Sequence, residues 1–150
     1  MTATGHAVIG VVIAAKIGNP VLAIPIAFAS HCLADMFPHW DTATNVKQKG
    51  KRQTIIDSAI DVFISLLATY ALVVFIFPQT SLFYAYIIVF ASQALDWLMA
   101  PYYFFRWKFP PFYWAYRFQK DILDHRLDKP WGIINQVAVL VALVVIAKLI

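Results

Sequence analysis

Long runs of apolar residues constrain this chain more than any other feature. Residues 55–77 (IIDSAIDVFISLLATYALVVFIF) and 131–149 are each long enough to cross, as a helix, the roughly 30 Å hydrocarbon core of a bilayer. The runs are uninterrupted and do not alternate between apolar and polar residues, which favours helices over a transmembrane β-barrel. The sequence therefore predicts an all-α polytopic membrane protein.

The composition also indicates a membrane protein. Hydrophobic residues make up 61% of the chain and charged residues 13%, whereas a soluble domain is roughly half apolar and a quarter charged. A length of 150 residues suits one domain, so we expect residues 1–150 to form a single membrane domain. No basic segment precedes the first apolar stretch, so we expect no cleaved signal peptide. The single cysteine, Cys32, excludes an internal disulfide.

The apolar runs and the turns between them predict five membrane segments. These segments are residues 4–17, 21–37, 55–77, 82–105 and 131–149. The first two are short, at roughly 21 and 25 Å, and can form either a thin spanning pair or a re-entrant hairpin; we favour the spanning pair. The predicted fold class is an all-α polytopic membrane bundle of these segments plus one amphipathic interfacial helix.

Charged residues outside the apolar runs indicate how the chain is oriented. Lys and Arg are concentrated in loops 41–54 and 106–129, whereas the turn at 78–81 has no charge. Because cytoplasmic loops carry an excess of Lys and Arg, we expect both loops and the N-terminus in the cytoplasm, and no nucleic-acid binding. Residues 107–125 are rich in aromatic residues and contain Pro110-Pro111, which interrupts a helix, so we expect this stretch to lie flat at the membrane surface.

Ionisable residues from separate segments fall at one depth, near the expected cytoplasmic side. His31 and Asp35 are four residues apart and share a helix face, as do Asp57 and Asp61. A charge inside a membrane is costly and is by default a candidate functional site. Imidazole and carboxylate ligands suit Zn, Mn or Fe, and helix bundles hold metals between facing helices. We therefore predict a divalent metal, Zn or Mn, with the candidate ligands His6, His31, Asp35, His39 and Asp61.

Structural explanations remain open for each of these residues. A single buried histidine such as His31 is more often a hydrogen-bonded core residue than a ligand, and a His–Asp pair at this spacing can simply stabilise its helix. His39, just beyond the second segment, also fits an interfacial residue. Asp57 fits a helix cap.

Three short motifs surround the candidate ligands. Gly5-His6-Ala-Val-Ile-Gly10 is similar to Thr-His-x-x-x-Gly, Ser30-His31-x-x-x-Asp35 contains His-x-x-x-Asp, and Pro38-His39-Trp40-Asp41 is similar to Pro-Asp-x-Asp-His with His39 in place of the first Asp. With Asp96 and Trp131–Gln136, these motifs resemble the predicted bacterial membrane-bound metal-dependent hydrolases, a family of small multi-span proteins. That family's His-Arg-Gly-x-Thr-His-Ser stretch has only Asp124-His125-Arg126 as a counterpart here. The resemblance implies a bacterial inner-membrane protein with metal-dependent hydrolase activity.

These features predict a membrane-embedded, metal-dependent hydrolase of the phosphoesterase type. The candidate catalytic residues are Asp96, as general base or additional ligand, and His125. A site at headgroup level suggests a phosphorylated lipid or isoprenoid as substrate, because such a molecule reaches the site by diffusing within the leaflet, and membrane lipid is the expected partner. The alternative is a non-catalytic membrane scaffold, subunit or ion-handling protein, in which the polar residues complete helix packing.

Overall fold

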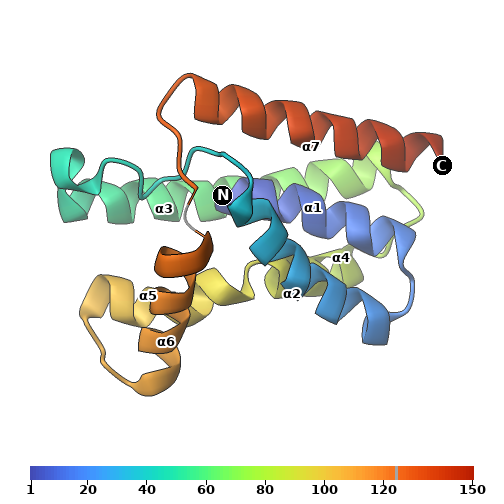
Figure 1. Cartoon of the computed structure of the whole chain (residues 1–150). Coiled ribbons are helices and arrows are strands. Elements are labelled where there is room, and N and C mark those ends of the chain that lie inside the picture. Colours follow the sequence, from blue (N-terminus) through green and yellow to red (C-terminus); the bar gives the residue numbers. More distant parts are fainter. Residues whose placement is uncertain (124) are drawn as a thin grey trace.

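The chain is all-helical in the computed structural model, which describes residues 1–123 and 125–150 (Figure 1). In chain order the helices are α1 (Ala3–Lys16), α2 (Pro20–Met36), α3 (Val46–Ala71), α4 (Leu82–Ser92), α5 (Ala94–Phe105), α6 (Pro110–Phe118) and α7 (Trp131–Leu149). Two short π-helical segments extend this set: η1 (Leu72–Ile76) continues α3, and η2 (Gln119–Leu123) continues α6. The predicted all-α fold class is confirmed.

Two helices are long and apolar enough to cross a membrane: Val46–Ile76, which is formed by α3 and η1 and is kinked at Gly50 (φ 80°, ψ 163°), and α7. α4 and α5 provide a third candidate if the pair, which is bent by 52°, forms one span. α1 and α2 are apolar but shorter. The described part of the chain therefore has two strong candidate spans and at most three, fewer than the five segments predicted from the sequence.

The first two helices are short because a turn separates them at the predicted place. Asn19 precedes α2, and its side-chain oxygen accepts a hydrogen bond from the Val21 N–H at 2.9 Å. Pro20 occupies the first turn of α2, where a missing N–H costs nothing. α1 and α2 are consequently 14 and 17 residues long, which is short for a helix that crosses a core of about 30 Å.

Residues 82–105 do not form the single straight segment that the sequence predicts. α4 ends at Ser92, and Gln93 has φ −104° and ψ 4°, outside the helical region. The Gln93 side chain turns towards α1, where its amide donates a hydrogen bond to the carbonyl oxygen of Ala3 at 3.0 Å. This break redirects α5 and brings Asp96 close to the N-terminal turns of α1.

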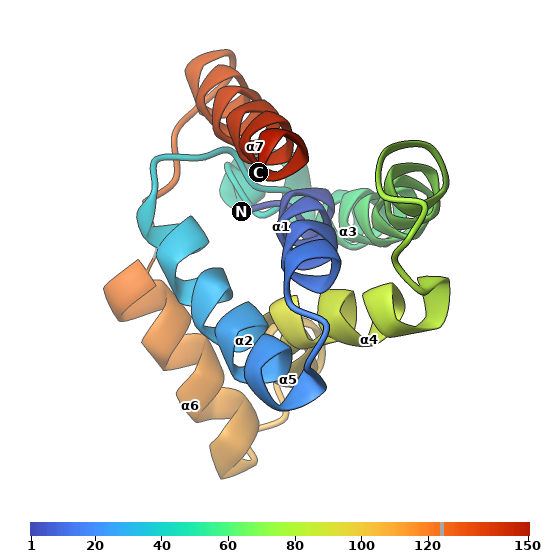
Figure 2. The same cartoon turned by 90° about the vertical axis from the view of Figure 1, so that its right-hand side faces the viewer.

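α1 occupies the centre of the helix arrangement and packs against α2, α3, α4 and α7 (Figure 2). Its inward positions are small or β-branched, and Ala7, Val11 and Ala14 are buried. Small residues allow helix backbones to approach closely. A Cβ atom at Gly10 would lie 2.9 Å from the Cα atom of Val89, so the close approach of α1 to α4 requires glycine at this position.

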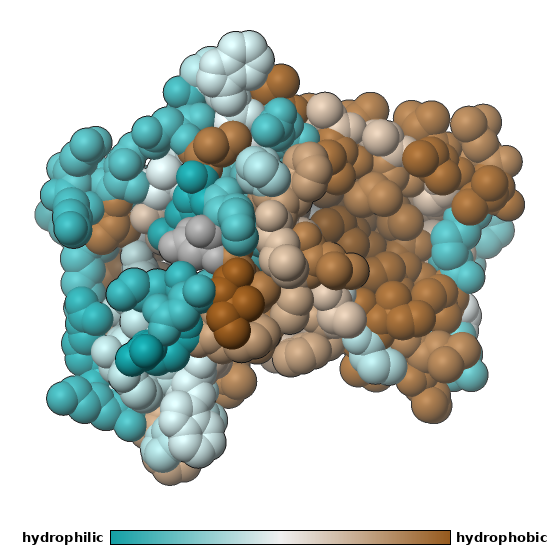
Figure 3. All heavy atoms as spheres, in the orientation of Figure 1, coloured by the Kyte–Doolittle hydropathy of each residue, from teal (hydrophilic) through white to brown (hydrophobic). Residues whose placement is uncertain are grey.

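Polar and apolar surfaces are separated along the molecule (Figure 3). The visible face is hydrophilic where α3 begins and where the long loops lie, and hydrophobic towards the C-terminal end of α7. Large apolar side chains are exposed on several helices, including Val21 at 77%, Phe83 at 77% and Leu149 at 80%. Soluble monomers rarely expose apolar patches of such extent. This exposure of apolar side chains is consistent with a membrane protein.

The aromatic stretch 107–125 contains the helix α6. Its proline pair begins this helix and does not interrupt it. Pro110-Pro111 occupies the first turn of α6, where intrahelical N–H bonds are not needed. α6 packs against α5 through aromatic rings: the centroid of Tyr102 lies 5.2 Å from that of Tyr113 and 4.8 Å from that of Tyr116. That this stretch lies flat on the membrane surface stays a prediction.

Candidate metal centre

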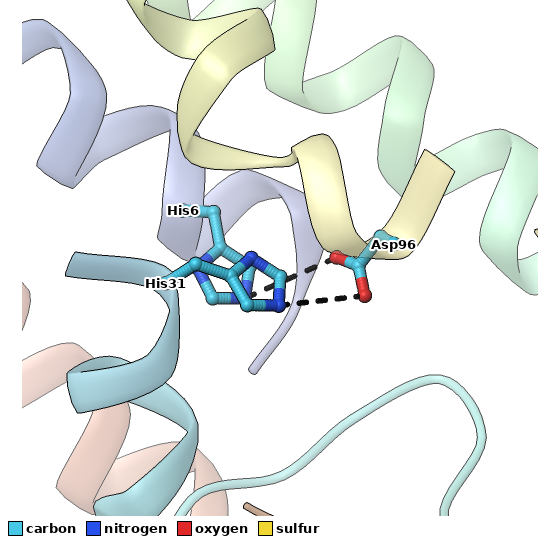
Figure 4. A group of neighbouring side chains, drawn as sticks. All are labelled: His6, His31 and Asp96. Carbon is cyan, nitrogen blue, oxygen red and sulfur yellow. Dashed lines mark ion pairs between the residues drawn. The ribbon is translucent and has the colours of Figure 1, made fainter. Parts of the chain in front are cut away.

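Histidine and aspartate side chains from α1, α2 and α5 meet near the N-terminal end of α1 (Figure 4). His6 comes from α1, His31 and Asp35 from the last turns of α2, and Asp96 from the first turn of α5. One ligand atom from each of His6, His31 and Asp96 lies within 4.8 Å of the other two. This buried group can hold a metal ion. We call His6, His31, Asp35, His39 and Asp96 together the metal centre.

The Nε2 atoms of two histidines face both carboxylates. His6 Nε2 lies 3.2 Å from Asp35 Oδ1 and 4.0 Å from Asp96 Oδ2. His31 Nε2 lies 3.3 Å from Asp35 Oδ2 and 3.8 Å from Asp96 Oδ1. The two imidazole rings are stacked, with centroids 4.0 Å apart and planes 9° from parallel. Both Nε2 atoms therefore face Asp96, as Figure 4 shows, and both also lie close to Asp35.

Backbone carbonyls fix the tautomers of two histidines. His31 Nδ1 lies 2.8 Å from the carbonyl oxygen of Ser92, which can only accept, so Nδ1 carries the proton and donates it. His39 Nδ1 lies 2.7 Å from the carbonyl oxygen of Phe37 and donates in the same way. In the neutral ring each Nε2 then carries a lone pair. Histidines that ligate metals commonly donate their second ring N–H to a backbone carbonyl or a carboxylate, so both residues fit this role.

His6 is buried without hydrogen bonds to its ring. Its side chain is 1% exposed, and neither ring nitrogen has a hydrogen-bond partner among the described residues. The approach of Nε2 to Asp35 lacks hydrogen-bond geometry. An unsatisfied buried polar group destabilises the fold by about 1–3 kcal/mol. An ion that engages Nε2 would remove this cost.

His39 lies at the edge of the metal centre, in the loop after α2. Its Nε2 is 2.6 Å from the Met1 amino nitrogen and 4.0 Å from Asp35 Oδ1. The same amino group forms an ion pair with Asp35. Burial and the nearby amino group lower the pKa of His39, which favours the neutral imidazole that metal binding requires.

Asp41 belongs to an ion pair beside the metal centre. Its Oδ2 lies 3.3 Å from Arg126 Nε. Burial raises the pKa of Asp41, but the Met1 amino group and Arg126 lower it more, so the carboxyl group is held in its ionised form. Arg126 also donates to the carbonyl oxygen of Ala43 at 3.2 Å. These contacts fasten the loop after α2 to the loop before α7.

The structure does not bring Asp61, a predicted ligand, into the metal centre. Asp61 receives the N–H groups at the start of α1: Ala3 N donates to Oδ2 at 2.6 Å and Thr4 N to Oδ1 at 3.2 Å. The Thr4 hydroxyl donates to the same Oδ1 at 2.6 Å. The first N–H groups of a helix lack intrahelical partners, and a carboxylate there is stabilising. Asp61 therefore caps α1 from the neighbouring helix α3.

His125, predicted to be catalytic, contributes its backbone to this region. Its carbonyl oxygen accepts a hydrogen bond from the N–H of His39 at 3.3 Å. Its side chain is exposed, with Nδ1 3.3 Å from the carbonyl oxygen of Leu123. Asp124 lies outside the described residues. Within the described ranges, the His125 ring has no contact with the metal centre.

Gln119, from η2, contacts the metal centre, and sequence analysis did not identify it. Its Nε2 lies 2.6 Å from His31 Nε2 and donates to Asp96 Oδ1 at 3.2 Å. The residue is 7% exposed. Ala115 and Leu123, four positions before and after it, are buried as well. A polar residue on the inward face of an amphipathic helix is the signal that points to Gln119.

Comparisons with known proteins give no assignment. No protein-family model matches the chain, and neither the curated proteins nor the solved structures contain a significant match. The functional argument therefore depends on the residues of the metal centre and their surroundings.

Proposed function

We propose that this chain is a membrane-embedded, metal-dependent hydrolase that acts on a phosphorylated lipid or isoprenoid at the cytoplasmic face. One observation supports the proposal most: the buried Nε2 of His6 has no hydrogen-bond partner among the described residues and, with His31 Nε2, faces the carboxylates of Asp35 and Asp96. Lone pairs and carboxylate oxygens gathered in a buried volume repel one another unless a cation lies between them. The Met1 amino group supplies one cation through its ion pair with Asp35, and a divalent metal would supply a second beside His6, His31 and Asp96.

The donor set favours Zn or Mn. Imidazole nitrogens and carboxylate oxygens suit these ions, and the set has no thiolate. His6, His31 and Asp96 are the ligand candidates supported by their mutual distances. Asp35 lies against His6 and His31 at 3.2 and 3.3 Å, and serves as a further ligand or as the counter-charge of the site. Two imidazoles and a carboxylate leave coordination positions for a substrate, as in catalytic zinc sites.

Bound at this site, a divalent metal would polarise a phosphoryl oxygen and make water a better nucleophile at neutral pH. The chain's own residues would position the reactants and move the proton. The side chain of Asp96 is 31% exposed and that of Asp35 is 11% exposed, so Asp96 is more accessible to water. The carboxylate that does not coordinate the metal can act as the general base, and the greater exposure of Asp96 favours Asp96 in that role with Asp35 as the coordinating carboxylate.

The place of the metal centre favours a substrate held in the membrane. The excess of Lys and Arg in loops 41–54 and 106–129 favours a cytoplasmic location for both loops and the N-terminus. In this arrangement α1 and α2, which are shorter than the candidate spans, form the re-entrant hairpin between the N-terminus and the loop after α2. Asp35, near the end of α2, then lies at the level of the cytoplasmic headgroups. A phosphorylated lipid or isoprenoid reaches that level by lateral diffusion.

A second candidate function is a non-catalytic membrane scaffold, subunit or ion-handling protein. The observation that favours it is the Gln119 amide, whose nitrogen lies 2.6 Å from His31 Nε2 and engages its lone pair. In that case the histidines and aspartates form a polar network that holds α1, α2 and α5 together.

Metal analysis of the purified full-length chain in mild detergent separates the two candidates. We expect wild type to carry a stoichiometric divalent metal at neutral pH and to lose thermal stability in EDTA. His31→Ala should lose the metal, because a ligand is removed from a buried site. His125→Ala is the matched control, since its exposed ring lies outside the metal centre, and should keep the metal. A wild type that is free of metal and indifferent to EDTA contradicts the proposal and favours the scaffold.

Hydrolysis is tested separately, by phosphate release from phosphatidate and from an isoprenyl diphosphate in mixed micelles. We expect release by wild type and a large loss of kcat in Asp96→Asn. Metal binding without release from any phosphorylated lipid would support a metal site and contradict the hydrolase.

A further inference from the structure

A large basic cavity opens beside the metal centre. It has a volume of about 660 Å³ and lies between the beginning of α3, the end of α5 and the α6–η2 helix. Its basic lining residues are Lys47, Lys51, Arg106, Lys120 and Arg126. None of the described residues that line it is acidic. The cavity is therefore suited to an anion.

The basic side chains differ in how firmly they are held. Arg126 is fixed by Asp41 and by the carbonyl oxygen of Ala43. Lys47, Lys51 and Lys120 are exposed, on the first turns of α3 and on η2. Long, exposed lysine side chains can turn towards a phosphate and donate charge-assisted hydrogen bonds. A fixed arginine beside adjustable lysines can thus accommodate headgroups of more than one shape.

Shared lining residues connect this cavity to the metal centre. Gln119 and Arg126 line the basic cavity and also a small cavity whose walls include Asp35, His39 and Asp96. Gln119 contacts both His31 and Asp96. A phosphate in the basic cavity would therefore lie next to the proposed metal ligands, separated from them by little more than the Gln119 amide.

A narrow groove meets the same place from another direction. It lies between α3 and α5 and has a volume of about 110 Å³; Val62, Trp97 and Phe104 form its apolar side, and its acidic lining residues are Asp41, Asp61 and Asp96. Met99 and Tyr103 line both the groove and the basic cavity. The apolar side can therefore take the first carbons of a chain whose anionic group lies in the basic cavity, and the rest of that chain would lie in the membrane.

We propose that the basic cavity binds the phosphate-bearing headgroup of a membrane amphiphile whose apolar chain begins at the apolar side of the groove between α3 and α5 and continues into the membrane. This inference names a binding site for the substrate of the proposed function. It rests on the proposed function only for the claim that the bound ligand is hydrolysed. Binding of the headgroup requires the lysines and arginines but not the metal.

The test measures binding of a fluorescent dioleoyl phosphatidate by the full-length chain in mild detergent, with dioleoyl phosphatidylcholine as the lipid control. Lys47→Gln combined with Lys120→Gln should weaken phosphatidate binding by at least about tenfold, because two charge-assisted hydrogen bonds are lost. Lys16→Gln combined with Lys108→Gln removes the same charge outside the cavity. This matched control should bind as wild type does.

Two further arms identify the source of the phosphate and separate this inference from the proposed function. Glycerol 3-phosphate and inorganic phosphate, as competitors, should bind at least about tenfold more weakly than phosphatidate, since they lack the chain that the groove would bury. Equal affinities would show that the apolar chain does not contribute to binding, and would contradict the proposal that the ligand is an amphiphile. His31→Ala and EDTA should abolish metal binding and phosphate release, and should weaken phosphatidate binding less than the Lys47 and Lys120 double variant does. If both double variants bind like wild type, the basic cavity is not the headgroup site, even when metal binding and hydrolysis persist.

Discussion

Two polar regions flank the first two turns of α1, and they differ in how their hydrogen bonds are completed. Asp61 accepts from the backbone of Ala3 and Thr4 and from the Thr4 hydroxyl, at 2.6 to 3.2 Å. At the metal centre, by contrast, neither ring nitrogen of His6 has a hydrogen-bond partner among the described residues, and His6 Nε2 faces carboxylates.

This difference separates a structural role from a ligand-binding role. Buried polar groups in folded proteins are nearly always hydrogen-bonded, and a specific exception calls for an explanation. Asp61 needs none, because donors of its own chain complete its environment. His6 is the exception, and a cation at its Nε2 would complete an environment that the described chain leaves incomplete.

The largest expected effect that tests this comparison is on metal affinity in His6→Ala. Loss of an outer-shell partner already lowers metal affinity by 10- to 100-fold, so loss of a ligand should lower it by at least about 100-fold. Competition with a chelator of known affinity measures the change. The metal-free variant should also unfold at a lower denaturant concentration than metal-free wild type, because removal of a buried ring that stacks on His31 leaves a cavity; affinity and stability are therefore measured separately. Unchanged metal affinity would remove the distinction between the two regions.

Asp61→Ala should show the opposite pattern. It removes an ionised acceptor from several donors, so we expect the free energy of unfolding to fall by about 2–4 kcal/mol. Metal affinity should change by no more than a few-fold. Asp61→Asn keeps one carbonyl oxygen and should lose about half as much. A variant that folds normally but loses its metal would show that Asp61 is a ligand after all.

Gln119→Leu sharpens the comparison from the side of η2. Leucine suits an inward face that already carries Ala115 and Leu123, so the fold should be retained. Removing the amide frees His31 Nε2, and metal affinity should stay within about tenfold of wild type or increase. If the histidines and aspartates form only a structural network, the variant instead leaves His31 and Asp96 unpaired and loses stability. Chelator competition and denaturant unfolding, read on the same samples, distinguish the outcomes.

Ser92→Ala should have the smallest effect. The Ser92 hydroxyl donates to the carbonyl oxygen of His6 at 2.9 Å, whereas its own carbonyl oxygen, which alanine retains, accepts from His31. We expect a loss of about 1 kcal/mol in unfolding free energy, typical of one hydrogen bond, and no change in metal affinity. A change in metal affinity would show that the position of the His6 backbone, and not only its ring, determines the site.

Local sequence signals predicted the helix ends that depend on neighbouring residues. Asn19 and Pro20 form a cap and a first turn whatever lies around them, so the boundary between α1 and α2 could be read from the chain. The break at Gln93 could not, because it depends on a hydrogen bond to Ala3, ninety positions earlier. An apolar run that continues through such a break looks like one span.

The same limit applies to the metal centre. His31 and Asp35 share a helix face at a fixed spacing, so their proximity was predictable. Asp61 has the same spacing from Asp57, but its use depends on how α1 docks against α3. Gln119 joins the group only because α6 and η2 fold back along α5 and α2. Spacing predicts neighbours within one helix, whereas neighbours across helices depend on packing.

The central position of α1 has a consequence for the biogenesis of the protein. α1 precedes the helices that surround it, and its last neighbour, α7, is near the end of the described chain. α1 is synthesised before α7, so its contacts with α7 cannot form until the later helix has been made. Synthesis proceeds at about 5–20 residues per second. The surface of α1 that packs against α7 therefore stays in contact with lipid or the insertion machinery for several seconds, whereas Gly10 meets α4 earlier. A nascent chain that stalls before α7 would carry this surface uncovered, where quality-control proteases can recognise it.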